Sequence, residues 1–139
     1  MSDILADRTP PQNIEAEQAV LGAIFLEQEA IVTTSEILKP EDFYRGIHQR
    51  IYQAMLELSE KSEPVDLVTV TALLESKKQL DEVGGVSYLT DLANAVPTAA
   101  NVEYYCRIIE EKAILRQLIR TATKIVTDGY NQSDELQFL

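Results

Sequence analysis

The chain has 139 residues, of which 45% are hydrophobic, and a formal net charge of −11, so it is long enough for one domain with its own core. Residues 1–100 hold seven Lys and Arg against 17 Asp and Glu, and such an acidic surface repels nucleic-acid phosphates and favours a basic protein partner. One cysteine, one histidine, a polar N-terminus and no run of about 20 apolar residues exclude a His/Cys zinc site, a signal peptide and a membrane span, so we expect a cytoplasmic protein.

The chain is expected to begin with a flexible arm, residues 1–12, that leads into a helix. The arm ends in Pro10 and Pro11, which favour extended backbone, and Asn13 can cap the helix. Gly22 costs about 1 kcal/mol relative to Ala inside a helix, so it predicts a close helix crossing. One face of this helix is apolar and consists of Ile14, Val20, Leu21, Ile24 and Phe25.

Glu17 projects into the middle of that apolar face. We expect its carboxylate to accept hydrogen bonds from nearby backbone amides or to pair with an arginine. The alternative is a catalytic carboxylate, which we favour less because no second acidic group or histidine shares its spacing.

Four further helices are predicted before residue 100. They span about Glu29–Thr34, Ile47–Glu60, Leu67–Lys77 and Val86–Val96. Phe43 and Tyr44 are expected to anchor the connection after the first of these, and His48 is expected to be a packed, hydrogen-bonded side chain rather than a ligand. On the last helix, Tyr88 lies about 100° from the centre of the face predicted to point inward, which consists of Val86, Leu89, Leu92, Ala93 and Val96.

The β-branched side chains of residues 67–77 would also allow a strand. We predict a helix because Val70, Leu73 and Leu74 recur at helical spacing. No other segment offers a partner strand.

Residues 101–130 predict one helix of about 27 residues, with two apolar faces that look in different directions. Its first half carries Val102, Tyr105, Cys106, Ile109 and Ala113 within about 100° of arc, with Cys106 expected to be a buried apolar residue in a reducing compartment. The second apolar face is rotated by about 200° around the helix from the first and consists of Ile114, Leu115, Leu118, Ile119, Ala122, Ile125 and Val126. A single globular core would need only one apolar face of this helix. The first half is therefore predicted to dock on the preceding helices and the second half to project toward another helix.

Opposite the second face, Arg116, Arg120 and Lys124 recur at four-residue spacing. We expect a solvated stripe, with pairing to acidic residues of a neighbouring subunit as the alternative. After Gly129, Ser133 is a good N-cap for a further helix, so we expect a helical hairpin whose second helix is truncated; a frayed C-terminus is the alternative.

The predicted fold class is therefore all-α, with six helices and the start of a seventh. A compact helical head, residues 13–100, is followed by residues 101–139, the long helix that begins the hairpin.

No catalytic constellation is visible in this chain. None of its five glycines is followed by Lys, which excludes a phosphate-binding P-loop. Arg45 stands where a Glu-x-x-His metal pair with His48 would need Glu. We therefore expect no enzyme activity, and no catalytic, metal or cofactor-binding residues, in this chain by itself.

Residues 13–24 read NIEAEQAVLGAI, which closely resembles the opening helix of bacterial replicative DNA helicases of the DnaB type. The resemblance covers essentially all 139 residues. Further along the chain it rests on Asp42, Phe43, Tyr44, His48, Ile51, Tyr52, Val65, Asp66, Thr69, Gly84, Gly85, Tyr88, Leu89, Tyr105, Ile108, Ile109, Lys112 and Arg116.

This resemblance implies a non-catalytic N-terminal domain made of a head and a helical hairpin. In that family such domains pair through their hairpins and form a collar on a ring of six motor domains. The collar receives primase and, in some systems, a loader. ATP, Mg²⁺ and DNA are handled by the motor domain, so no nucleotide or DNA residue carries over and no tight binding of nucleic acid is expected here. The alternative is an independent helix-turn-helix DNA-binding regulator, which the acidic head argues against.

Two sets of residues are candidates for binding. The first is a partner surface of Tyr88 as the aromatic anchor with Glu15, Asp81 and Glu82, acids that can steer a basic partner. The alternative is that Tyr88 only covers the edge of the head and that the acids are ordinary solvated charges. The second set is expected to self-associate and consists of Leu115, Leu118, Ile119, Ala122, Ile125 and Val126; Ile119 and Ile125 are also weighed as partner contacts.

Overall fold

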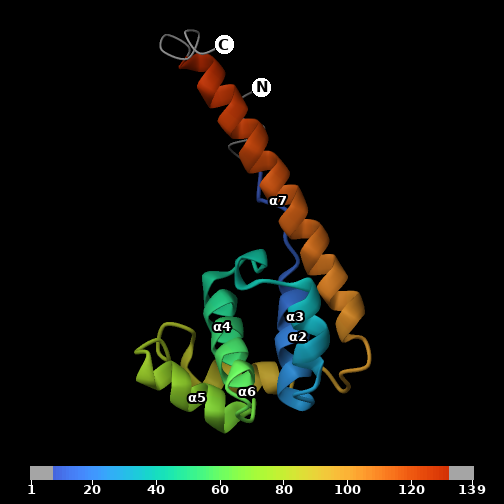
Figure 1. Cartoon of the computed structure of the whole chain (residues 1–139), viewed down its shortest axis with the longest axis vertical. Coiled ribbons are helices and arrows are strands. Elements are labelled where there is room, and N and C mark those ends of the chain that lie inside the picture. Colours follow the sequence, from blue (N-terminus) through green and yellow to red (C-terminus); the bar gives the residue numbers. More distant parts are fainter. Residues whose placement is uncertain (1–7, 132–139) are drawn as a thin grey trace.

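The computed structural model describes residues 8–131, in which the chain forms six α-helices, one 3-10 helix and no strand. The α-helices are α2 (Ile14–Leu26), α3 (Ala30–Ile37), α4 (Gly46–Glu60), α5 (Leu67–Ser76), α6 (Gly85–Ala93) and α7 (Val102–Tyr130), and the 3-10 helix is η1 (Pro40–Asp42). Figure 1 shows α2 to α6 gathered into a head and α7 extending well beyond it. The predicted all-α class is confirmed. The predicted start of a seventh helix at Ser133 lies outside the described residues.

The centre of the head is α2, which packs against α7, α6, α4 and α3. Because α2 is covered on several sides, nearly every residue from Ala16 to Ile24 is buried. The core around it also contains Phe43 and Tyr52, and the Tyr52 hydroxyl donates to the carbonyl of Leu38 at 3.0 Å. Burial raises the pKa of the Tyr52 hydroxyl far above its ordinary value.

Helix α5 resolves the ambiguity between helix and strand. The Asp66 side chain accepts from the backbone N–H of Thr69 at 2.9 Å, and Thr69 Oγ1 accepts from the N–H of Asp66 at 2.9 Å, which is a capping box that fixes the first turn. Val70 and Leu74 are then buried on one side, while Val68 is 77% exposed on the other. A period of 3.6 residues explains this pattern and a period of 2 does not.

Helix α6 differs from its predicted form in extent and in its buried face. It begins at Gly85 and ends at Ala93, and its N-cap Gly84 and first residue Gly85 have φ of 107° and 70°. The prediction that Val86 points inward is wrong, since Val86 is 49% exposed. The buried face centres on Tyr88, Leu89 and Leu92, and Val86 lies about 110° from that centre at 100° per residue.

The first half of α7 docks on the head as predicted. Val102, Cys106 and Ile109 are buried, and α7 packs against α2 and α3. Cys106 donates from Sγ to Thr34 Oγ1 at 3.6 Å, and its burial raises the pKa of the thiol. Within residues 8–131, no helix is long and apolar enough to cross a lipid bilayer.

The close helix crossing predicted at Gly22 is present. A Cβ atom at residue 22 would lie 2.4 Å from the carbonyl oxygen of Leu92 and 3.2 Å from Cβ of Ala95. The absent side chain therefore lets α2 approach the end of α6 directly.

We expect Gly22→Ala to destabilise the chain by about 1–3 kcal/mol, because overpacking at the crossing outweighs the gain in helix propensity. Gly129→Ala is the matched control, since a Cβ at residue 129 meets no atom within 4 Å. This variant should be neutral or more stable by up to about 1 kcal/mol. Urea unfolding of both variants measures the difference, and equal behaviour would contradict the crossing.

Candidate functional site

A buried hydrogen-bond network joins α2, α4 and α6 inside the head. Glu17 accepts from the backbone N–H of Tyr44 at 2.7 Å and from His48 Nδ1 at 2.7 Å, with a longer contact of 3.5 Å to the N–H of Arg45. Glu17 and His48 are both buried. The predicted amide contacts of Glu17 and the hydrogen-bonded role of His48 are therefore confirmed. Sequence reasoning missed that these two side chains contact each other, because 31 residues separate them.

Tyr88 continues this network toward the surface. Its ring stacks on His48 with an interplanar angle of 10°, and its hydroxyl lies 2.6 Å from His48 Nε2. A carboxylate only accepts, so His48 Nδ1 carries the hydrogen that it donates to Glu17. Gln18 Nε2 then donates to that hydroxyl oxygen at 3.1 Å. Tyr88 is thus partly buried, with its polar end bonded within the head.

The structure brings Tyr88 and Glu82 together in one groove of about 460 Å³ at the start of α6. The same groove contains Asp91 and Arg45, which the sequence analysis did not select. Glu82 also forms an ion pair with Arg50 at 3.2 Å. Asp91 lies three residues after Tyr88 and therefore shares its side of α6. This spacing in the sequence would have identified Asp91 as a further residue of the groove.

The other two predicted acids lie apart from this groove. Glu15 is exposed and lines a separate groove of about 350 Å³, between α2, the chain after α6, and α7. Gln18 lines that second groove and bonds to Tyr88, so the two grooves adjoin through this side-chain pair. Asp81 is exposed and lines neither groove.

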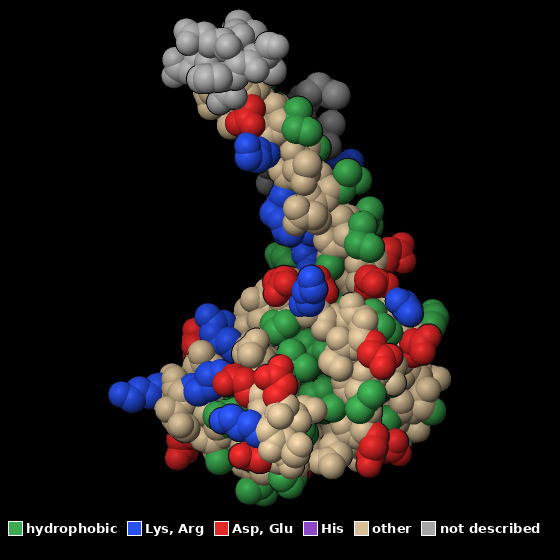
Figure 2. All heavy atoms as spheres, viewed as in Figure 1, with side chains coloured by type: hydrophobic (Ala, Val, Ile, Leu, Met, Phe, Trp, Pro, Cys, Tyr) green, Lys and Arg blue, Asp and Glu red, His purple; other side chains and the backbone are tan. Residues whose placement is uncertain are grey.

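The second apolar face of α7 is exposed among residues 8–131. All six predicted self-association residues are exposed: Leu115, Leu118, Ile119, Ala122, Ile125 and Val126. Figure 2 shows hydrophobic side chains along one edge of the projecting helix and Lys and Arg side chains along the other.

The predicted stripe of solvated cations is wrong for its first member. Arg116 is only 7% exposed, whereas Arg120 and Lys124 are exposed and Lys124 pairs with Asp128 at 2.8 Å. The reason is geometric, because the stripe continues the face of α7 that docks on the head. Arg116 lies seven residues, about two turns, after the buried Ile109, and that spacing was the available signal.

Among the described residues, no group of three or more His, Cys, Asp or Glu side chains is placed to hold a metal ion. The Glu17–His48 pair has no access for a substrate, since both side chains are buried. The accessible features of the described residues include two grooves with acidic residues and the exposed apolar face of α7.

Sequence and fold both resemble those of replicative DNA helicases. The family described as DnaB-like helicase N terminal domain matches residues 9–111. Replicative DNA helicase DnaB of Geobacillus stearothermophilus is 64% identical over 139 residues, and replicative DNA helicase DnaC of Bacillus subtilis is 65% identical. This chain is covered completely in both alignments but spans only 31% of each relative.

Two solved structures agree with this similarity. The N-terminal domain of DnaB helicase from Mycobacterium tuberculosis matches with a TM-score of 0.88 at 46% identity, over 91% of this chain and 88% of that one. A DnaB-like replicative helicase, described together with its interactions with primase, matches with a TM-score of 0.74 at 35% identity. That match covers 86% of this chain and 28% of the other.

We expect Glu17→Ala to destabilise the head by roughly 2–4 kcal/mol, because it leaves the N–H of Tyr44 and the buried His48 ring without their acceptor. Glu15→Ala, two residues earlier on an exposed position, is the control and should stay within about 0.5 kcal/mol of the parent. Guanidinium unfolding followed by circular dichroism measures both. A Glu17→Ala variant as stable as Glu15→Ala would contradict the network's structural role.

Proposed function

Because this chain belongs to the family of DnaB-like helicase N-terminal domains, we propose that it is the non-catalytic assembly and partner-docking domain of a replicative DNA helicase. It forms part of the collar of a hexamer and receives primase during DNA replication. The proposal concerns a whole protein, because the two relatives are each about three times as long as this chain.

The observation that carries the assembly role is the apolar face of α7 that is exposed among residues 8–131. Ile119, Ile125 and their neighbours are exposed on a helix that projects from the head. Burial of such a face contributes about 25 cal/mol per Å² before the costs of association. A contiguous exposed patch of this kind marks an interaction surface, and an amphipathic helix is the partner it fits.

Charge supports a basic protein as the partner of the head. The head holds the acidic excess of the chain, and Glu82 and Asp91 lie with Tyr88 in one groove. Carboxylates around a partly buried tyrosine provide both steering charge and an anchor. Primase is the partner described for a relative of 35% identity, and we propose it for this chain, with a helicase loader as a second partner of the collar.

The remaining assignments follow from the same proposal. ATP and Mg²⁺ act in the motor part of the whole protein, and this chain supplies no cofactor-binding residue. The acidic head does not bind DNA tightly, because affinity for a phosphate backbone requires clustered Lys and Arg. The partner-binding residues are Glu15, Asp81, Glu82 and Tyr88, and the self-association residues are Leu115, Leu118, Ile119, Ala122, Ile125 and Val126.

We expect Ile119→Asp combined with Ile125→Asp to reduce hexamer assembly of the whole protein, because each buries a carboxylate in the apolar contact. Sedimentation velocity at several concentrations measures the loss. Thr127→Asp is the matched control, since Thr127 is exposed and lies about 150° around α7 from the centre of that face. Unchanged assembly in the double variant would remove this face from the interface.

We expect Tyr88→Ala to weaken primase binding at both low and high salt, and Glu15→Ala to weaken it mainly at low salt, where its charge is less screened. Isothermal titration with the whole protein at two salt concentrations measures both effects.

Two further variants sharpen this comparison. Tyr88→Phe removes only the hydroxyl that bonds to His48, so it separates contact by the ring from support of the network. Glu60→Ala removes an exposed carboxylate of α4 that lines neither groove, and it should bind as the parent does. If all of these variants bind equally, primase docks elsewhere.

A further inference from the structure

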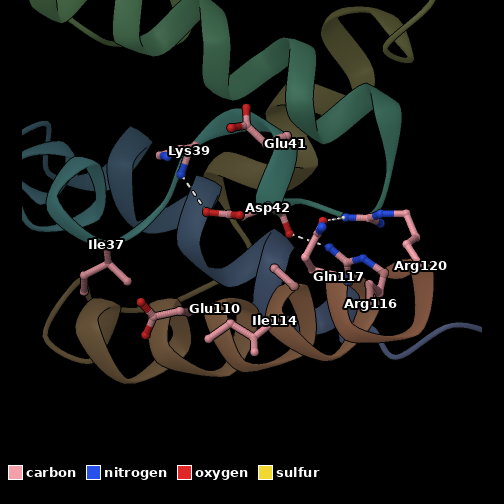
Figure 3. A pocket seen from close by; sticks show the side chains of 10 residues that line it. Ile37, Lys39, Glu41, Asp42, Glu110, Ile114, Arg116, Gln117 and Arg120 are labelled. Atoms are coloured by element: carbon pink, nitrogen blue, oxygen red, sulfur yellow. Dashed lines mark hydrogen bonds between the residues drawn. The ribbon is translucent and has the colours of Figure 1, made fainter. Parts of the chain in front are cut away.

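Arg116 lies where α7 leaves the head, and it contacts two other segments of the chain, one at Pro11 and one at Asp42 and Tyr44. Its Nη1 donates to the carbonyl of Pro11 at 2.7 Å, and its Nη2 donates to the carbonyl of Asp42 at 2.6 Å. Its guanidinium carbon lies 5.4 Å from the centre of the Tyr44 ring. Figure 3 shows the side chain reaching from α7 toward the backbone of Asp42.

These contacts fix the orientation of the Arg116 guanidinium group as well as its position. The guanidinium group is planar, so its donors form a rigid fork, and a charged donor binds a neutral carbonyl more strongly than a neutral donor does. Burial lowers the pKa of Arg116, yet an arginine remains charged in a protein. The carbonyls of Pro11 and Asp42 therefore have fixed positions relative to the buried guanidinium group of Arg116.

Two hollows flank the junction at this point. Hollows of about 370 Å³ and 650 Å³ are both lined by Arg116, the first toward α3 and η1 and the second toward residues 8–11 and Tyr44. Arg116 is also the last buried residue of α7 among those described. The helix continues from it to Tyr130, a lever of about 21 Å. A tilt of about 15° at Arg116 would displace the end of that lever by about 5 Å.

We propose that Arg116 is a positioning residue that sets the direction in which the projecting half of α7 leaves the head. It does so by joining three segments: the N-terminal segment at Pro11, η1 at Asp42 and the helix itself. The direction of α7 consequently depends on the docked N-terminal segment. This inference is independent of the proposed function, because it concerns distances within one chain.

Pulsed electron-spin distance measurements on the chain test it. One pair of spin labels, at Gln53→Cys on α4 and Thr127→Cys on α7, reports the direction of the helix, and both positions are exposed. A second pair, at Thr9→Cys and Thr123→Cys, reports whether the N-terminal segment lies beside α7. Cys106 is buried and its thiol pKa is raised, so it stays unlabelled in the folded chain, as labelling stoichiometry verifies.

The parent should give one narrow distance distribution for each pair. We expect Arg116→Met to broaden or shift both distributions, while circular dichroism shows an intact head. Arg120→Met is the matched control, since Arg120 is exposed one turn later and donates a hydrogen bond to Gln117 of the same helix; it should leave both distributions unchanged. Equal distributions in Arg116→Met and the parent, or equal broadening in Arg120→Met, would overturn the proposal.

Arg116→Lys keeps the test decisive if Arg116→Met fails to fold. A lysine retains the charge, but its single ammonium group lacks the planar fork that spans two separated carbonyls. We therefore expect at least one of the two label pairs to lose its narrow distribution. If Arg116→Lys matches the parent for both pairs, the fork geometry of Arg116 does not set the direction of α7.

Discussion

The organisation of this chain depends on helix α7, which has two apolar faces that point in different directions. The first half of α7 buries Val102, Cys106 and Ile109 against the head, and its second half presents an apolar face turned away by about 200°. A rigid helix cannot bend both faces onto one small core, so docking of the first half obliges the second half to project. Both the elongated shape in Figure 1 and the uncovered apolar face follow from this constraint.

The head provides a stiff base for that lever through a polar network inside an apolar core. Glu17 on α2 holds His48 and the backbone of Tyr44, and His48 in turn holds Tyr88 on α6. Each member has a partner, which is the condition under which a buried polar group does not destabilise a core. The network also relates the interior to the surface, because the last two members, Tyr88 and Gln18, line the two grooves of the head.

The two candidate surfaces differ in chemistry, which suits them to different partners. The α7 face is apolar, and an apolar face associates with another of its kind without much dependence on salt. The grooves around Tyr88 combine aromatic contact with carboxylates, so association there is steered by charge. Separate surfaces of this kind allow one domain to assemble with copies of itself and still receive a different protein.

The sequence alone determined the all-α class, the two faces of α7 and the close crossing at Gly22, because these depend on local periodicity and on the size of single side chains. The capped start of α5 was also local, since Asp66 and Thr69 are three residues apart. Such features are decided within a few turns of one helix, so the order of residues is enough to predict them.

Only the tertiary structure decided which polar groups are buried together. Glu17 and His48 are far apart in sequence, as are Arg116 and its acceptors at Pro11 and Asp42. Arg116 therefore resembled a solvated cation in the sequence, although it lies on the side of α7 that faces the head. The exposure of Val86 and the partial burial of Tyr88 also differ from the prediction, for the same reason. Their exposure depends on where neighbouring helices pack against α6, and no pattern within α6 itself contains that information.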